Sequence, residues 1–265
     1  MPPWAIITIL GIIEGITEFL PVSSTGHLLI AERWLHTHQS DLFNIVIQSG
    51  AVLAVLPLFP ERLRQFWFKF RDPATQAYAG KILLAFVLTG IGAFILDKKG
   101  FKLPKELKPV AIALFLGGVG FVLVEAWLRG RSLQNEVTWT MAWAVGLGQL
   151  LAAVFPGTSR SGVTILLCLL LGLNRPAATE YCFLVGIPTM LAAGGWEIFK
   201  ALHHPPPGAV PENWGMVFLG FVVSAIVSFI AVRWLLRYIQ THTFVIFGWY
   251  RIALAALIAG ILLAG

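Results

Sequence analysis

Six continuous apolar runs constrain this chain more than any other feature of its sequence. Crossing the hydrocarbon of a bilayer as a helix takes about 20 predominantly apolar residues. Runs of about that length cover residues 42–59, 78–96, 109–128, 178–199, 214–236 and 244–263. An outer-membrane β-barrel would instead alternate apolar and polar positions in short segments. The sequence therefore predicts an all-α integral membrane protein with six transmembrane helices.

Composition supports the same class. Hydrophobic residues make up 57% of the chain and charged residues only 12%, which is too little polar surface to cover a soluble globule of 265 residues. The formal net charge of +6 is spread over loops and forms no stripe that would suit a nucleic acid, so we expect contact with anionic lipid head groups instead. We predict one polytopic membrane domain over residues 1–265.

Two further apolar stretches resemble one another half a chain apart. Residues 11–27 and 146–162 align at a constant offset of 135, which pairs Gly11 with Gly146, Glu14 with Gln149, Pro21 with Pro156, and Ser24 with Ser159. This register predicts a doubled unit, with one repeat over about residues 1–130 and the other over about 136–265.

Each of these stretches is interrupted by a proline and a cluster of hydroxyl residues. Proline removes a backbone donor, and neighbouring Ser and Thr side chains compete for local hydrogen bonds, so a helix should stop there. The second apolar half is only about ten residues long. Each stretch therefore predicts a re-entrant helical hairpin, and non-helical backbone at membrane depth must be buried in protein or line a wet cavity. We expect the two tips to meet inside the protein.

The number of predicted spans between the two hairpins determines the membrane face from which the second hairpin enters. A re-entrant hairpin returns to its own side, and three predicted spans follow it before the second hairpin begins. The second hairpin must then enter from the opposite face, which predicts an inverted-topology repeat with a site near its pseudo-two-fold axis. The same count places both termini on one side of the membrane.

Two acidic residues stand in the first hairpin. Glu14 and Glu18 are four residues apart, so a helix brings both carboxylates to one face. Burying each charge in a bilayer costs on the order of 2–3 kcal/mol or more. A divalent cation such as Mg²⁺ or Ca²⁺, which also binds substrate phosphate oxygens, would compensate. A shared proton, an Arg partner, or solvation near a helix end are the alternatives.

Hydroxyl groups and one histidine follow the first proline. Ser24 lies three residues before His27, and such a pair can act as nucleophile and base, or the imidazole can itself attack phosphorus. Helix capping by Ser23, Ser24 or Thr25 is the simpler interpretation. The two are compatible because a helix N-terminus, here at Gly26, binds phosphate.

The second turn adds a cation. The guanidinium of Arg160 stays charged and its donor fork matches phosphate oxygens, although snorkelling to the interface is an alternative. Together the two turns offer a carboxylate pair, a nucleophile, a base and an anion clamp, a set that suits phosphoryl transfer. The candidate substrate-binding residues of both turns are Ser23, Thr25, Gly26, Gly157, Thr158, Ser159, Ser161 and Gln149.

The segments 14–27 (EGITEFLPVSSTGH) and 156–162 (PGTSRSG) closely resemble the two signature motifs of the bacterial undecaprenyl-diphosphate phosphatases, the bacitracin-resistance family. This resemblance covers essentially the whole chain. It implies that Glu14 and Glu18 handle metal and diphosphate, that Ser24 and His27 are the catalytic hydroxyl and imidazole, and that Arg160 binds diphosphate.

The resemblance further implies an enzyme of the bacterial inner membrane whose site opens to the outer face. Such an enzyme removes the terminal phosphate of the C55 isoprenoid diphosphate with Mg²⁺ or Ca²⁺, and so recycles the lipid carrier of peptidoglycan. We favour Ser24 as nucleophile and His27 as acid/base, with the reverse assignment left open, and we also leave a homodimer open. The positive-inside rule favours a cytoplasmic location for the loops rich in Arg, such as residues 62–71.

Two other functions compete with this one. Inverted repeats with broken helices are also a transporter architecture, so a transporter or flippase of a phosphorylated lipid is the main alternative. A phosphatidic-acid-type phosphatase ranks lower, because such enzymes also need a later His with an Asp and the chain has no Asp after Arg160. Outside the motifs, we interpret Glu125 and Arg129 as an interfacial helix pair, and Arg251 as explained equally well by an interfacial aromatic belt and by function.

Overall fold

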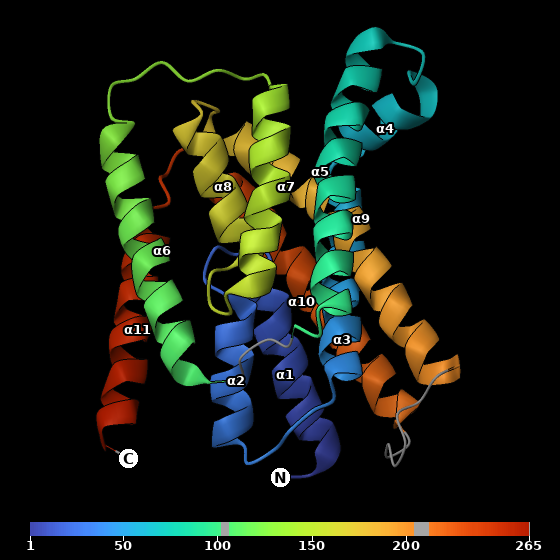
Figure 1. The fold of residues 1–265 in the computed structure, drawn as a ribbon, viewed down its shortest axis with the longest axis vertical. Coiled ribbons are helices and arrows are strands. Elements are labelled where there is room, and N and C mark those ends of the chain that lie inside the picture. The colour runs from blue at the N-terminus through green and yellow to red at the C-terminus, as the bar shows by residue number, and fades with distance from the viewer. Residues whose placement is uncertain (102–105, 204–211, 265) are drawn as a thin grey trace.

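The computed structural model describes residues 1–101, 106–203 and 212–264, and its secondary structure is helical (Figure 1). The only β pairing among these residues is an isolated bridge between Gln134 and Leu173. The helices are α1 (Pro3–Thr17), α2 (Ser24–Trp34), α3 (Asp41–Val55), the 3-10 turn η1 (Leu56–Leu58), α4 (Pro60–Phe68), α5 (Pro73–Lys98), α6 (Leu107–Trp127), α7 (Trp139–Val154), α8 (Arg160–Leu170), α9 (Arg175–His203), α10 (Trp214–Tyr238) and α11 (Val245–Ala264). The predicted all-α class is confirmed.

Six helical segments of the described residues are long and apolar enough to cross a membrane. They are Asp41–Leu58, Pro73–Lys98, Leu107–Trp127, Arg175–His203, Trp214–Tyr238 and Val245–Leu263. Each contains most of one predicted apolar run. The helix α5 begins earlier than its run because proline is favoured in the first turn of a helix, where its missing N–H is not needed. The chain is a multi-pass membrane protein.

Two short helical hairpins lie between the spans. In Figure 1 the pair α1–α2 occupies the half of the molecule that holds both chain termini, and the pair α7–α8 occupies the other half. The turns of the two pairs approach each other near the middle. Both termini lie at the same end, as the span count predicts.

The two halves of the chain interlock through these hairpins. Helix α1 packs against α10 of the second half, whereas α7 packs against α5 of the first half. Helices α6 and α11 pack against each other. A two-fold relation between the halves would produce this exchange, and the inverted repeat stays a prediction that the packing favours.

The turn of each hairpin ends on a serine with the same unusual backbone. Ser23 and Ser159 have φ angles of 73° and 67°, and their hydroxyls accept hydrogen bonds from Gly26 N (3.4 Å) and Gly162 N (3.1 Å). A positive φ is uncommon for a residue with a side chain. The equivalent caps are separated by 136 residues, so the constant offset of 135 is wrong beyond the prolines. The second turn contains one extra residue, and Arg160 is therefore the structural counterpart of Ser24.

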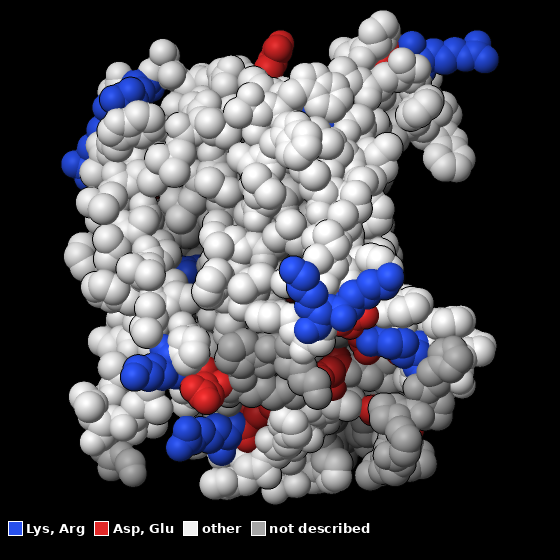
Figure 2. Space-filling view, in the orientation of Figure 1, with Lys and Arg blue, Asp and Glu red and all other residues white. Residues whose placement is uncertain are grey.

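The outer surface suits a bilayer. Figure 2 shows charged side chains near the upper end and across part of the lower half of this face, with a broad area of mostly uncharged side chains in the upper half between them. Large apolar side chains such as Leu83, Ile112 and Phe218 remain more than half exposed on the spans. This surface would be lipid-facing in a membrane, and polar groups that matter for chemistry lie inside.

Candidate active site

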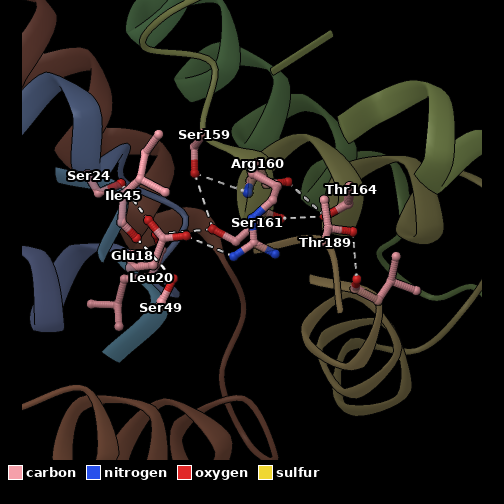
Figure 3. Close-up of polar contacts among 12 residues, drawn as sticks. Glu18, Leu20, Ser24, Ile45, Ser49, Ser159, Arg160, Ser161, Thr164 and Thr189 are labelled. Carbon is pink, nitrogen blue, oxygen red and sulfur yellow. Dashed lines mark hydrogen bonds and ion pairs between the residues drawn. The ribbon is translucent and has the colours of Figure 1, made fainter. Parts of the chain in front are cut away.

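The carboxylate of Glu18 joins the two turns (Figure 3). Its Oε2 accepts a hydrogen bond of 2.7 Å from Ser24 Oγ, and its Oε1 accepts one of 2.8 Å from Arg160 Nη2. Glu18 caps the end of α1, while Ser24 and Arg160 are the first residues of α2 and α8. The predicted meeting of the two tips is confirmed, and the Glu18 side chain at their junction is only 5% exposed.

Arg160 lies in a niche that a glycine leaves open. A Cβ atom at Gly186 of α9 would stand only 1.7 Å from Arg160 Nη1. The guanidinium carbon is 5.6 Å from the centre of the Phe19 ring, and the side chain is 13% exposed. Its buried Nε has no hydrogen-bond partner among the described residues. Arg160 is thus held in place while donors remain unused, as an anion-binding arginine requires.

Glu14 lies one helical turn before Glu18 and is fully buried. Neither of its carboxylate oxygens receives a hydrogen bond from the described residues. Its counterpart Gln149 instead donates a hydrogen bond of 2.8 Å to Thr89 Oγ1 on α5. Gln149 therefore makes a contact between α7 and α5. Glu14, in the first hairpin, is a buried carboxylate without a hydrogen-bond donor among the described residues.

The other hydroxyls of the turns mostly support the backbone. Ser161 is 1% exposed, and its Oγ donates a hydrogen bond of 3.3 Å to the Leu20 carbonyl, a second link between the turns. It also lies 3.2 Å from Ser159 Oγ. The hydroxyl of Thr158 donates to the Phe155 carbonyl at 2.7 Å.

The remaining candidates of the turns differ in exposure. Thr25 is exposed, whereas Gly26 and Gly157 are buried. Gly157 has a φ of 90°, and a Cβ there would come within 2.6 Å of the Val110 carbonyl oxygen. Only glycine fits this position without strain.

His27 is held away from Ser24. Its Nδ1 lies 2.8 Å from the Ser23 carbonyl and its Nε2 lies 2.7 Å from Tyr250 Oη, so both ring nitrogens are engaged. The imidazole and phenol rings are stacked, with centroids 5.7 Å apart. The structure thus brings Ser24 to Glu18, and no hydrogen bond of the described residues joins Ser24 to His27. Sequence reasoning missed Tyr250 because it lies 223 residues from His27.

For Arg251 the sequence left an interfacial aromatic belt and a functional role equally open. The residue is fully buried, so the interpretation through an interfacial aromatic belt is wrong. Its guanidinium donates to main-chain carbonyls of both turns, namely Pro21 at 3.2 Å, Gly157 at 3.1 Å and Thr158 at 3.0 Å. The available signal was its position inside an apolar run, because an ionisable residue within a membrane segment is a functional candidate by default.

Glu125 has a partner other than the predicted one. It is 1% exposed and accepts hydrogen bonds from Arg175, with Nε 2.9 Å from Oε1, and from Phe244 N at 2.8 Å. The predicted interfacial pair with Arg129 is wrong, since Glu125 instead ties the start of α9 to the start of α11. This buried ion pair lies outside the Glu18 cluster.

Glu18 has the Arg partner that the sequence allowed as an alternative to a cation, and the carboxylates of Glu14 and Glu18 are also of the type that binds a hard divalent cation. No group of three or more His, Cys, Asp or Glu side chains occurs among the described residues, so Glu14 and Glu18 would be the only carboxylate ligands in the cluster. Such ions accept substrate phosphate oxygens and water in the remaining positions. The bare, buried oxygens of Glu14 are the observation that fits this role.

Comparison with known proteins identifies the family of this chain. Residues 7–257 match the family model described as bacitracin resistance protein BacA. A protein of Rhizobium etli named undecaprenyl-diphosphatase is 50% identical over 258 residues, which covers 97% of this chain and 96% of the relative. A protein of the same name from Xanthomonas axonopodis pv. citri is 47% identical over 249 residues, covering 94% and 93% of the two chains. The chain therefore belongs to the bacitracin resistance protein BacA family.

Proposed function

We propose that this protein is an undecaprenyl-diphosphate phosphatase, which hydrolyses the C55 isoprenyl diphosphate to the monophosphate and inorganic phosphate. The observation that carries the proposal is the Glu18 carboxylate that holds Ser24 on one side and Arg160 on the other. A hydroxyl bonded to a carboxylate, next to an arginine with free donors, is an arrangement suited to phosphoryl transfer. The reaction recycles the lipid carrier of peptidoglycan.

The contacts of Ser24 support it as the nucleophile. Ser24 Oγ donates its proton toward Glu18, so the carboxylate is positioned to accept that proton as the oxygen attacks the terminal phosphorus. The bond between this phosphorus and the bridging oxygen then breaks, and the lipid monophosphate leaves. Water hydrolyses the phosphoserine, which releases inorganic phosphate and restores the serine hydroxyl.

Charge and helix geometry support the binding of the diphosphate. Arg160 can offer its unused donors to the phosphate oxygens on which charge grows in the transition state. Both α2 and α8 begin at the junction, and the free amides of a helix N-terminus bind phosphate. His27 can serve as acid/base only if it releases Tyr250, so we assign the first proton transfer to Glu18.

A bound Mg²⁺ or Ca²⁺ ion would neutralise part of the diphosphate charge and polarise its oxygens. Glu14 and Glu18 are the residues that would hold it. Glu14 supports this role because its carboxylate is buried without any donor. Glu18 would share its carboxylate between the ion and its two hydrogen-bond partners.

We also propose how the protein lies in the membrane. The hairpins α1–α2 and α7–α8 would be re-entrant and enter from opposite faces of the bacterial inner membrane, which their placement in opposite halves of the molecule supports (Figure 1). The site would open to the outer face, and the end with α4 and its basic residues would be cytoplasmic.

Transport of a phosphorylated lipid is the second candidate function. It is favoured by the interlocked halves, in which α1 packs on α10 and α7 on α5, because such an exchange suits alternating access. The contact between Ser24 and Glu18 favours chemistry over passage alone.

Phosphate release from C55 diphosphate by the purified protein tests the proposal. We expect release of one phosphate per lipid, loss of activity with EDTA, and recovery with Mg²⁺ or Ca²⁺. Movement of the lipid between leaflets without phosphate release would support the transporter instead. Full activity in EDTA would contradict the role of the metal ion, while the proposal that the protein is a phosphatase would stand.

A further inference from the structure

Arg251 of α11 is a buried cation that the proposed chemistry does not use. It is 0% exposed, and none of the ion pairs of the described residues includes it. Its guanidinium donates instead to five main-chain carbonyls, those of Pro21, Ala113, Leu114, Gly157 and Thr158. A charge buried without a carboxylate is costly, so these polar contacts are what makes its position tolerable.

Three of these carbonyls belong to the turns that meet at Glu18. Pro21 stands two residues before the cap Ser23, and Thr158 stands one residue before the cap Ser159. The donors of a guanidinium form a rigid, planar fork. One fork that binds both turns therefore fixes the position of one turn relative to the other.

Arg251 reaches the turns because α6 lacks a side chain at the right place. A Cβ atom at Gly117 would lie 2.2 Å from Arg251 Nη2 and 2.7 Å from its Cζ. The guanidinium also donates to the carbonyls of Ala113 and Leu114 in the same helix. Helix α6 therefore forms one wall of the niche that holds Arg251, and it orients the guanidinium donors toward the two turns.

We infer that Arg251 is a positioning residue, which holds the two hairpin turns in the register that brings Ser24 and Arg160 to the same carboxylate. This inference rests on the proposed function for its effect on rate. Arg251 itself lies behind the turns, bonded to their carbonyls, and acts through Ser24 and Arg160 rather than by touching the diphosphate.

Gly117→Ala tests the inference without removing any polar group. The added methyl must displace the guanidinium, while Gly120→Ala is a matched control one turn along α6, whose Cβ would meet only Leu166 Cδ1 at 3.4 Å. Both changes give the same gain in helix propensity. We expect Gly117→Ala to lower kcat for C55 diphosphate at least about tenfold, with KM within about threefold of wild type, because Arg251 binds carbonyls of the turns and not the substrate.

Folding is followed by gel filtration and thermal unfolding in detergent. A role in stability alone would lower the melting temperature and leave kcat per folded molecule normal, which would overturn the inference. Equal kcat values for Gly117→Ala and Gly120→Ala would overturn it as well.

A second measurement does not depend on turnover. In a chain whose buried thiols Cys168 and Cys182 have been replaced, Thr25→Cys and Thr158→Cys place one thiol on each hairpin. We expect the yield of their cross-link with a short bismaleimide to change at least about threefold with Gly117→Ala and to stay the same with Gly120→Ala. Unchanged yields would overturn the inference, whereas a wild-type protein that releases no phosphate would overturn only the proposed function.

Discussion

Gly186→Ala should displace the Arg160 guanidinium while leaving the arginine itself in the sequence. The new Cβ would lie 1.7 Å from Arg160 Nη1, and ordinary contact begins at 3.4 Å, so the guanidinium must retreat by about 1.7 Å. The bond of 2.8 Å to Glu18 cannot survive such a shift. A misplacement of about 1 Å in a catalytic arrangement can cost on the order of 100-fold. We therefore expect kcat/KM to fall at least about 100-fold, or about 2.7 kcal/mol.

The assay is phosphate release from C55 diphosphate by folded protein. The fold should persist, because the displaced atoms are the far end of a flexible side chain. Gly195→Ala is the matched control, since it lies on the same helix α9 and its Cβ would meet nothing within 4 Å. A folded Gly186→Ala protein with the kinetics of Gly195→Ala would refute the reasoning that Arg160 must occupy this niche.

Three other changes probe the surroundings of the site. Ser24→Ala removes the proposed nucleophile, so turnover should fall at least about 1,000-fold; a smaller loss in phosphate release would move that role to His27. Tyr250→Phe removes one hydrogen bond worth about 0.5–1.5 kcal/mol, so kcat should change no more than about 10-fold; a loss as large as that of Ser24→Ala would make the Tyr250 hydroxyl part of the chemistry. Glu125→Ala removes the buried acceptor of Arg175 and Phe244 N but leaves a partly solvated guanidinium, so unfolding in detergent should show a loss of about 1–3 kcal/mol; an unchanged melting temperature would contradict the stabilising role of this ion pair.

Those features of the fold that depend on local chemistry could be predicted from the sequence. The six spans follow from runs of apolar residues, because a helix in lipid satisfies its own backbone hydrogen bonds. The interruptions follow from Pro21 and Pro156 with their neighbouring hydroxyls. The alignment of the turns went wrong by one residue, because only the backbone reveals that Ser23, rather than Ser24, is the cap equivalent to Ser159.

The remaining parts of the site depend on tertiary contacts. Nothing in the sequence distinguishes Gly186 from the other helical glycines. Only the fold shows that the guanidinium of Arg160, at the start of α8, lies against it. Tyr250 and Arg251 come from α11, near the other end of the chain, and no spacing in the sequence links them to the turns. The direction of His27 likewise depends on Tyr250, so the pairing of Ser24 with Glu18 could not be read from the motif.

The central claim is that two turns, one from each half of the chain, act as one site on a single diphosphate. A double-mutant cycle of Glu18→Gln and Arg160→Lys, followed by phosphate release from C55 diphosphate, tests it most directly. Each single change should lower the rate at least about 100-fold. Because residues that act as a unit are strongly non-additive, the double variant should be less than about tenfold slower than the slower single variant. Losses that multiply in the folded double variant would mean that the two residues act independently, and would contradict the claim.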